Sequence, residues 1–282
     1  TLMGAGDFFM KKRESLNLGN IRSFQEMRSV YESLGGLPDL GQPYCVTLHL
    51  PDRYFGFIGT SHTAEPDHVQ WVRFREEWQR FMESPNPNKI VLYEGQTSMP
   101  IAETDEEAIR KGADIGYSRW LGERAGIECV SPEPDSFQEL EELLRLGYSE
   151  DEVMTYYVGR QVAQWRRYDY RTDPDLNDYI ARTVRRYEVT GKWSKEFTVE
   201  GVRGLIESRL DGNTIELAPR NLFSRIADPS EDPVSGASSM IRDRSIFEKL
   251  QSSWADGKDV FCAYGSGHAI VLEPALRKLL EE

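Results

Sequence analysis

The chain has 282 residues, with 34 Lys and Arg against 47 Asp and Glu, which gives a formal net charge of −13. This length fits one large domain, and a composition of 39% hydrophobic and 11% aromatic residues is too apolar for a disordered chain. The acidic balance argues against a nucleic-acid-binding protein, which needs a basic face. No apolar run reaches the ~18–20 residues of a membrane-spanning helix. We therefore expect a soluble globular protein without a transmembrane segment.

The cysteines indicate a reducing compartment. Cys45, Cys129 and Cys262 are odd in number and too widely spaced for a disulfide framework or a Cys-x-x-Cys metal site. Each lies in an apolar run, which is typical of a buried free thiol. Residues 1–13 place basic residues after an apolar patch, the reverse of the order in a signal peptide. These features predict a cytoplasmic location.

The N-terminal half alternates between helical and extended patterns. In chain order it predicts a helix over 21–34, strands over 44–50 and 54–58, a helix over 67–82, a strand over 89–93, a helix over 105–125 and a strand over 127–130. Thr104 and Glu107 form a capping-box pattern before the third helix. The alternation predicts an α/β fold with a mostly parallel central sheet flanked by helices.

The middle of the chain has a different character. Residues 136–210 are charged, helical and rich in Arg and Tyr, and breaks at 147–149 and 172–174 divide them into three or four helices. The rest reads as a loop over 228–236, a helix over 238–254, a buried strand over 259–264 and a closing helix over 273–280. We expect a single α/β domain over 1–282, with a helical insertion at about 136–236.

A polar side chain follows each predicted core strand at its carboxyl end. These residues are His62, Glu94, Glu133 and His268. Ligands of open parallel sheets bind at the carboxyl ends of the strands, so the four are expected to converge. Two imidazoles with one or two carboxylates are a common ligand set for a divalent metal such as Mn, Zn or Co. His62 and His268 also share a Gly-x-x-His pattern, in which glycine lets the backbone turn sharply.

Each of these residues also has a simpler interpretation, which stays open at this stage. The two histidines fit hydrogen-bonded loop residues, Glu94 fits a cap on a helix N-terminus, and Glu133 fits a solvated loop residue.

Further candidates lie beside the strand-end residues. Arg242 and Arg244 belong either to a solvated helix end or to the strand-end cleft, where an arginine would hold a substrate carboxylate or a developing oxyanion. Ser61 and Ser266, next to the histidines, are candidate substrate contacts. The chain has no Gly-x-Ser-x-Gly nucleophile elbow.

Four short motifs resemble the TraB/TIKI superfamily, which is related to the erythromycin esterase-like and ChaN-like proteins. They are Phe-Ile-Gly-Thr-Ser-His at 57–62, Val-Leu-Tyr-Glu-Gly at 91–95, Arg-Asp at 242–243 and Tyr-Gly-Ser-Gly-His at 264–268. The motifs cover about 57–134 and 238–274, whereas the middle helical block matches no family. The resemblance implies an α/β fold of paired halves with a site between them. His62, Glu94, Arg242 and His268 match the family's motif positions, and Glu133 resembles a later strand-end carboxylate.

The resemblance implies several activities. TIKI proteins are described as metal-dependent proteases, erythromycin esterases open a lactone with a histidine-activated water, ChaN-like proteins bind haem and TraB-type proteins act in peptide pheromone signalling. We expect a metal-dependent hydrolase of a peptide, amide or ester bond, with His62, Glu94 and His268 at the metal and Arg242 stabilising negative charge. The alternatives are a metal-free esterase-like hydrolase with His as general base, and a non-catalytic protein that binds a peptide or haem. The expected partner is a small-molecule or peptide substrate, and the oligomeric state is left open.

Overall fold

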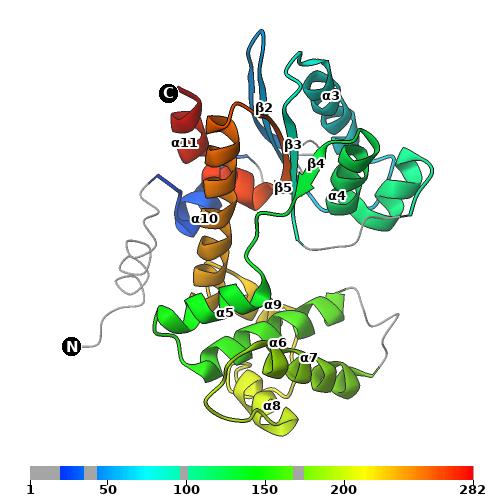
Figure 1. The fold of residues 1–282 in the computed structure, drawn as a ribbon. Helices are drawn as coiled ribbons and strands as arrows, with labels where there is room; N and C mark the ends of the chain where they lie inside the picture. The colour runs from blue at the N-terminus through cyan, green and yellow to red at the C-terminus, as the bar shows by residue number, and fades with distance from the viewer. Residues whose placement is uncertain (1–19, 35–42, 96–100, 168–174, 282) are drawn as a thin grey trace. The chain divides into compact units, whose positions relative to one another are not determined.

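A computed structural model describes residues 20–34, 43–95, 101–167 and 175–281. By its internal contacts the chain divides into two compact units (Figure 1). The sheet unit comprises Gly19–Glu133 and Asp243–Glu282, and the helical unit comprises Pro134–Arg242. The expectation of a single domain with an inserted helical segment stays a prediction.

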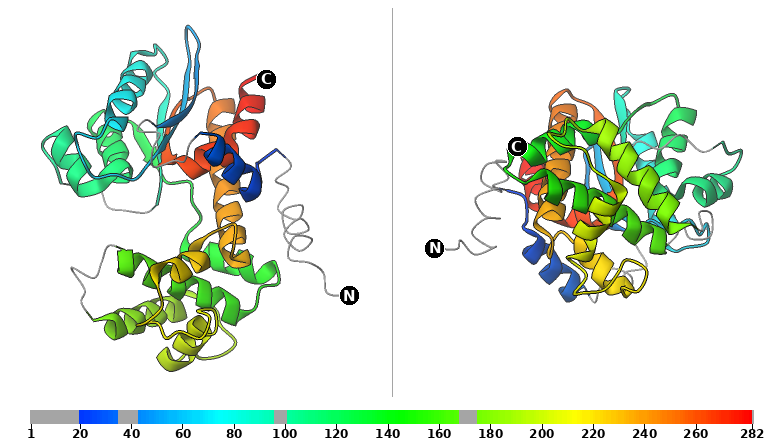
Figure 2. Two further views of the ribbon diagram at one scale, coloured as in Figure 1. Left: turned by 180° about the vertical axis from the view of Figure 1, so that it is seen from behind. Right: turned by 90° about the horizontal axis from the view of Figure 1, so that it is seen from below.

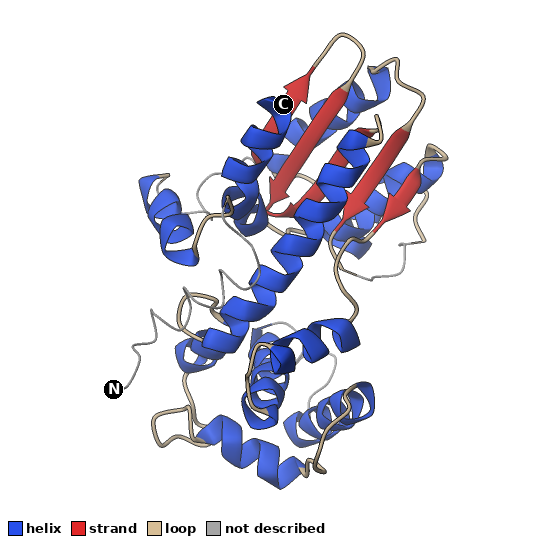
Figure 3. Cartoon of the chain, turned by 60° about the vertical axis from the view of Figure 1, so that its left-hand side comes forward, coloured by secondary structure: helices blue, strands red, loops and turns tan. Residues whose placement is uncertain are grey.

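The sheet unit contains a mixed, mostly parallel sheet. Its five strands among the described residues are β1 (Tyr44–His49), β2 (Tyr54–Thr60), β3 (Lys89–Tyr93), β4 (Glu128–Val130) and β5 (Asp259–Gly265). They lie in the order β1-β2-β5-β3-β4; β1 is antiparallel to β2, and the other neighbours are parallel (Figure 3). The predicted α/β class with a mostly parallel sheet is confirmed. The last strand, β5, lies between β2 and β3, so three strand ends that are distant in sequence are neighbours.

Helices cover both faces of this sheet (Figures 1 and 2). On one face α3 (Gln70–Glu83) and α4 (Asp105–Arg124) contact the strands, and Phe74 packs edge-on against Phe261 at 5.3 Å. On the other face lies α11 (Ser266–Glu281), beside α2 (Phe24–Ser33). Every residue of β2 and β5 is buried, which explains why these strands read as continuous apolar runs rather than alternating ones.

The helix α11 begins earlier than predicted. The sequence predicts this helix only over 273–280, but it starts at Ser266 and contains Pro274. Because proline has no N–H, the carbonyl of Ile270 loses its helical donor. The Arg22 Nη1 donates to that carbonyl at 2.8 Å, and the Arg22 backbone N–H donates to the carbonyl of Val271 at 2.9 Å. This remote arginine stabilises a helix that the local sequence disfavours.

The helix α10 (Pro233–Ala255) also begins inside a predicted loop, over 228–236. The Asp232 carboxylate accepts the backbone N–H of Ser235 at 2.8 Å, and Pro233 stands at the first helical position. An Asp N-cap followed by proline is a helix-start signal, because proline lacks only an N–H that the first turn leaves unsatisfied. The loop prediction was therefore wrong at its C-terminal end.

The helical unit is organised around α6 (Glu150–Arg167). This helix contacts α5 (Ser136–Arg145), α7 (Leu176–Thr190), α8 (Val199–Glu207) and α9 (Arg220–Ala227). Gly147, with φ +85°, follows α5 at the first predicted break. The second break, at 172–174, lies outside the described residues. None of the helices in the described ranges is long and apolar enough to cross a membrane.

Candidate active site

The carboxyl ends of β2, β3 and β5 bring His62 and Glu94 together. His62 follows β2, and Glu94 directly follows β3. The His62 Nε2 lies 3.4 Å from Glu94 Oε2, and the same carboxylate oxygen accepts the backbone N–H of Gly265 at 2.8 Å. Gly265 ends β5 immediately before α11, so Glu94 also has the contact near a helix N-terminus that its simpler interpretation anticipated.

A buried carboxylate holds the other side of the His62 ring. The His62 Nδ1 lies 3.0 and 3.1 Å from the two carboxylate oxygens of Asp114, whose side chain is fully buried. The Thr60 hydroxyl also donates to Asp114 and is 3.2 Å from the carbonyl of Tyr264. In the neutral imidazole, an Nδ1 proton donated to Asp114 leaves the lone pair on Nε2, whereas the protonated ring donates to both Asp114 and Glu94. The His62 side chain is 46% exposed, so the ring is reachable from solvent.

The backbone is strained on both sides of the His62–Asp114 contact. Only three non-glycine residues in the described chain have positive φ, and two of them are His62, at 51°, and Ala113, at 47°. Ala113 has ψ −149° and interrupts α4 directly before Asp114. Such conformations cost of order 1–3 kcal/mol each and concentrate at functional sites. The fold therefore sustains two unfavourable conformations that position this histidine and its carboxylate.

The glycines of the two Gly-x-x-His motifs permit close approach. A Cβ on Gly265 would lie 2.6 Å from His62 Nε2, and a Cβ on Gly59 would lie 2.7 Å from the Cβ of Ala269 on α11. Both separations are far shorter than a van der Waals contact, so a side chain at either position would displace the site. In each motif the glycine therefore lets the end of the strand pack directly against the neighbouring residues.

His268 forms a second histidine–aspartate pair. Its Nδ1 lies 2.5 Å from Asp243 Oδ1, both side chains are largely buried, and the ring packs edge-on against Tyr264 at 5.6 Å. His268 lies in the first turn of α11, three residues after Gly265, and is therefore not the loop residue of its simpler interpretation. Residues three apart on a helix are close neighbours. Both pairs therefore lie at the carboxyl edge of the sheet, each with its carboxylate on Nδ1.

The predicted substrate contacts have partners or burial of their own in the structure, and their contact with a substrate stays a prediction. The Ser61 hydroxyl donates to Gln70 Oε1 at 2.9 Å, and Ser266 is buried at the start of α11. The Arg244 Nε lies 3.8 Å from Glu248 on α10. Arg242 belongs to the helical unit.

The predicted metal ligands are assembled only in part. Glu133 lies on the loop after β4, while His62 and Glu94 face each other and His268 pairs with Asp243. Within the described ranges, no group of three or more His, Cys, Asp or Glu side chains is arranged to hold a metal ion.

Sequence reasoning missed the two aspartates. Asp114 lies three residues before Tyr117, so both share a helix face, and an acid on that buried face was the available signal. Asp243 directly follows Arg242 in the Arg-Asp motif at 242–243, where only the arginine was predicted to have a role.

The cysteines do not compete with the histidines as nucleophiles. Burial raises the pKa of Cys45 and of Cys129 to about 11 and that of Cys262 well above its usual range. All three are free thiols and are protonated at neutral pH, whereas a thiolate is the nucleophilic form.

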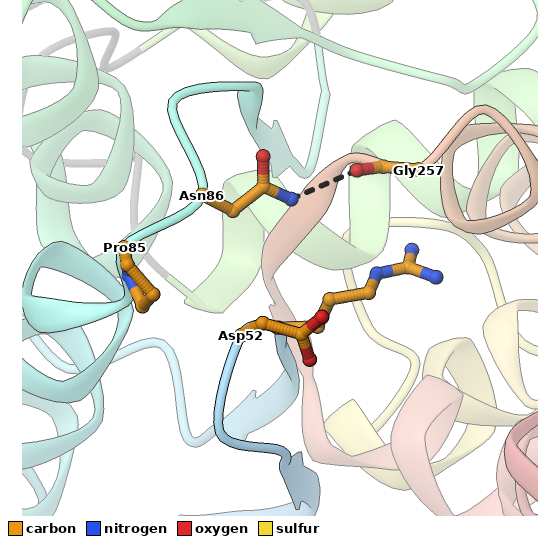
Figure 4. A pocket seen from close by; sticks show the side chains of 5 residues that line it. Asp52, Pro85, Asn86 and Gly257 are labelled. Atoms are coloured by element: carbon orange, nitrogen blue, oxygen red, sulfur yellow. Dashed lines mark hydrogen bonds between the residues drawn. The ribbon is translucent and has the colours of Figure 1, made fainter.

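A pocket of about 390 Å³ lies at the opposite edge of the sheet (Figure 4). It is lined by the turn between β1 and β2 and by the loops before β3 and β5, through Asp52, Arg53, Pro85, Asn86 and Gly257. Two of these lining residues are joined, because the Asn86 side chain donates to the carbonyl of Gly257 at 2.8 Å. This pocket adjoins the amino ends of the parallel strands and is separate from the histidine pairs.

Comparison with known proteins gives no relative. No family model, no curated protein and no solved structure matches the chain. The candidate site therefore has to be interpreted from its own geometry.

Proposed function

We propose that this protein is a hydrolase of an ester or amide bond, in which His62 is the general base that activates water. The observation that carries the proposal is the contact of His62 Nδ1 with the buried carboxylate of Asp114, at 3.0 Å. A buried carboxylate on Nδ1 orients the ring so that Nε2, beside Glu94, is the nitrogen that would accept a proton. No ordinary surface histidine needs a buried acid and a strained backbone for its position.

The reaction would proceed by addition and elimination. The His62 Nε2 takes a proton from water, and the water oxygen adds to the carbonyl carbon of the substrate. The resulting tetrahedral species expels the alcohol or amine, which takes up a proton as the C–O or C–N bond breaks. The imidazolium that forms on His62 lies between Asp114 and Glu94, and both carboxylates stabilise its positive charge. The His268–Asp243 pair is the candidate donor of the leaving-group proton.

A metal-assisted form of the same hydrolysis is the second candidate. In both pairs the carboxylate is on Nδ1, the arrangement that commonly orients a metal-binding histidine through its other nitrogen. The 3.4 Å between His62 Nε2 and Glu94 Oε2 also matches two ligands of one tetrahedral ion, which stand about 3.4 Å apart. The fit is partial, because the described residues do not assemble a third ligand. His62 and Glu94 would hold the ion, and it would polarise the carbonyl.

We also propose that the substrate is a small molecule or a peptide, and that the protein is cytoplasmic. A relationship to the TraB/TIKI superfamily and the interpretation of the helical unit as an insertion are further parts of this proposal.

The test compares two histidines that have the same carboxylate distance. His49 Nε2 also lies 3.4 Å from a carboxylate, that of Glu77, but at the other edge of the sheet. We expect His62→Gln and Asp114→Asn to lower kcat/KM for p-nitrophenyl esters or peptide amides by at least about a hundredfold. His49→Gln should retain the activity. Equal rates for wild type and His62→Gln, or no turnover of any ester or amide by the wild type, would contradict the proposal.

Metal content separates the two candidates. Elemental analysis of the purified protein for Zn, Mn and Co, followed by chelation, decides between them. The metal-free form predicts no stoichiometric metal and full activity after chelation. Loss of activity on chelation, restored by one of these ions, would favour the metal-assisted form.

A further inference from the structure

The segment between β2 and α3 carries His62, and one side chain holds the first residue of this segment. The backbone N–H and the hydroxyl of Ser61 both donate to the same atom, Gln70 Oε1, at 3.1 and 2.9 Å. Because a backbone N–H can only donate, the amide atom that faces it is the oxygen, and the orientation of the Gln70 side chain follows. Ser61 directly precedes His62, so Gln70 holds the backbone where it enters the positive φ of His62.

Gln70 itself is held in place by α3. It is the first residue of this helix and is 1% exposed, and the helix packs on the sheet through the buried ring of Phe74. The next residue, Trp71, is also 1% exposed, and its Nε1 donates to the carbonyl of Glu65 at 2.7 Å. The first turn of α3 therefore holds the segment at two positions, one directly before His62 and one after it.

The hydrogen bonding of the Gln70 amide is an independent observation. The oxygen accepts two hydrogen bonds, but the Nε2 is buried and forms no hydrogen bond with any residue that the structure describes. A buried donor without a partner is costly, and a methionine would fill the same space without that cost. Packing alone therefore does not favour glutamine at this position, whereas the two contacts with Ser61 do.

The two residues before His62 are thus bonded to different helices. The Thr60 hydroxyl donates to Asp114 on α4, and Ser61 donates to Gln70 on α3. The His62 ring lies 3.0 Å from the same Asp114 carboxylate. A non-glycine residue with φ 51° keeps this conformation only where the surrounding structure imposes it. The contact with Gln70 is the one that α3 contributes, and it lies next to the strained residue.

We propose that Gln70 is a positioning residue for His62. By holding Ser61, it keeps the His62 ring on Asp114, with Nε2 placed to accept a proton. It acts through Ser61 and not by contact with the substrate. This inference rests on the proposed role of His62 as the general base. Misplacement of a reacting group by about 1 Å can lower a rate roughly a hundredfold, so loss of this contact should affect the chemical step rather than substrate binding.

The test replaces Gln70 by methionine, which keeps the approximate size and removes the acceptor. We expect the kcat of Gln70→Met for an ester or amide substrate to fall at least about tenfold, while KM changes by less than about twofold. The melting temperature should stay close to that of the wild type, because the unpartnered Nε2 is removed together with the acceptor. Gln79→Met, at an exposed position of the same helix, is the matched control and should retain the wild-type kcat. Wild-type kcat in folded Gln70→Met would overturn the inference.

Nitrogen-15 NMR of the imidazole rings tests the positioning of His62 without turnover. In the wild type we expect the neutral His62 ring to carry its proton on Nδ1, towards Asp114, and in Gln70→Met we expect a mixture of both tautomers. The spectrum of His62→Gln assigns the signals. A wild type that hydrolyses no ester or amide but shows this change would contradict the proposed function and leave Gln70 as the residue that positions His62. An unchanged His62 spectrum in Gln70→Met would overturn the inference whatever the activity.

Ser61→Ala keeps the inference testable if Gln70→Met fails to fold. This variant removes the hydroxyl contact with Gln70 but keeps the backbone contact, so kcat should fall several-fold with KM unchanged. A raised KM with unchanged kcat would instead assign the Ser61 hydroxyl to the substrate and would overturn the positioning role.

Discussion

The two edges of the sheet each hold a histidine 3.4 Å from a carboxylate, but they are built differently. At the amino edge, His49 pairs with Glu77, which is also held by Arg80 at 2.6 Å and by the Tyr54 hydroxyl at 3.1 Å. At the carboxyl edge, His62 pairs with Glu94 and has a second, buried carboxylate on its other nitrogen. Distance alone therefore does not mark a reactive histidine. His62 differs from His49 because each of its ring nitrogens lies near a carboxylate and because its backbone is strained.

Two buried aspartates show the same contrast. Asp259, at the amino edge, accepts from the Tyr54 backbone N–H at 3.0 Å, from Asn86 at 3.1 Å and from Lys89 at 3.1 Å. Asp114, at the carboxyl edge, contacts Thr60 and a half-exposed histidine. A carboxylate surrounded by fixed donors stabilises the fold, whereas one that orients a solvent-facing imidazole is suited to proton transfer. Three variants sharpen this comparison.

The largest effect is expected at Asp259. Replacing it in Asp259→Asn leaves the ammonium of Lys89, which is 12% exposed, without its charge partner. Breaking such a buried pair costs about 3–5 kcal/mol of unfolding free energy. Denaturant unfolding followed by circular dichroism measures this loss. The exposed Asp52→Asn should stay within about 0.5 kcal/mol of the wild type. A similarly small effect for Asp259→Asn would contradict the structural role.

A medium, pH-dependent effect is expected at Glu273, which joins α11 to β1 and to the segment before α2. Burial alone raises its pKa, but hydrogen bonds from Tyr44, Arg22 and Arg277 outweigh it, so the pKa lies below its usual value in the folded protein. A lowered carboxyl pKa stabilises the fold above the unfolded-state pKa, and this contribution is lost as pH falls through the folded-state pKa.

Glu273→Gln should therefore cost about 1–3 kcal/mol at pH 7, and its difference from the wild type should shrink below pH of about 4.3. Unfolding free energies measured between pH 7 and 3 test this trend. Exposed Glu281→Gln serves as the control and should follow the wild type throughout. A difference that stays constant with pH would show that the charge of Glu273 is not what stabilises this contact.

The smallest effect is expected at Ala113. Glycine tolerates φ 47° and ψ −149°, so Ala113→Gly relieves the strain, while the added unfolded-state entropy of glycine offsets part of this gain. We expect a net gain of about 1 kcal/mol in unfolding free energy. Ala181→Gly, in the regular helix α7, should instead lose about 1 kcal/mol. Equal losses in both variants would mean that Ala113 is not strained.

Much of the framework followed from local patterns. Apolar runs predicted strands close to their observed bounds, such as Lys89–Tyr93, and the helix from Asp105 begins where Thr104 accepts the backbone N–H of Glu107. The strand-end rule also predicted that His62 and Glu94 would meet. The strand and the helix start were predictable because burial patterns and capping depend on residues that are close in sequence. The contact of His62 with Glu94 was predictable because the carboxyl ends of parallel strands lie at the same side of a sheet.

Tertiary structure alone decided the rest. Gly112 weakens the helix locally, but alanine itself favours a continuous helix, and only the fold shows that the kink at Ala113 places Asp114 against a histidine 52 residues away in sequence. The early start of α11 despite Pro274 depends on Arg22, 248 residues from the carbonyl it satisfies. A sequence encodes each residue's preference, but whether a strained or unsatisfied position is sustained depends on partners that only the folded chain supplies.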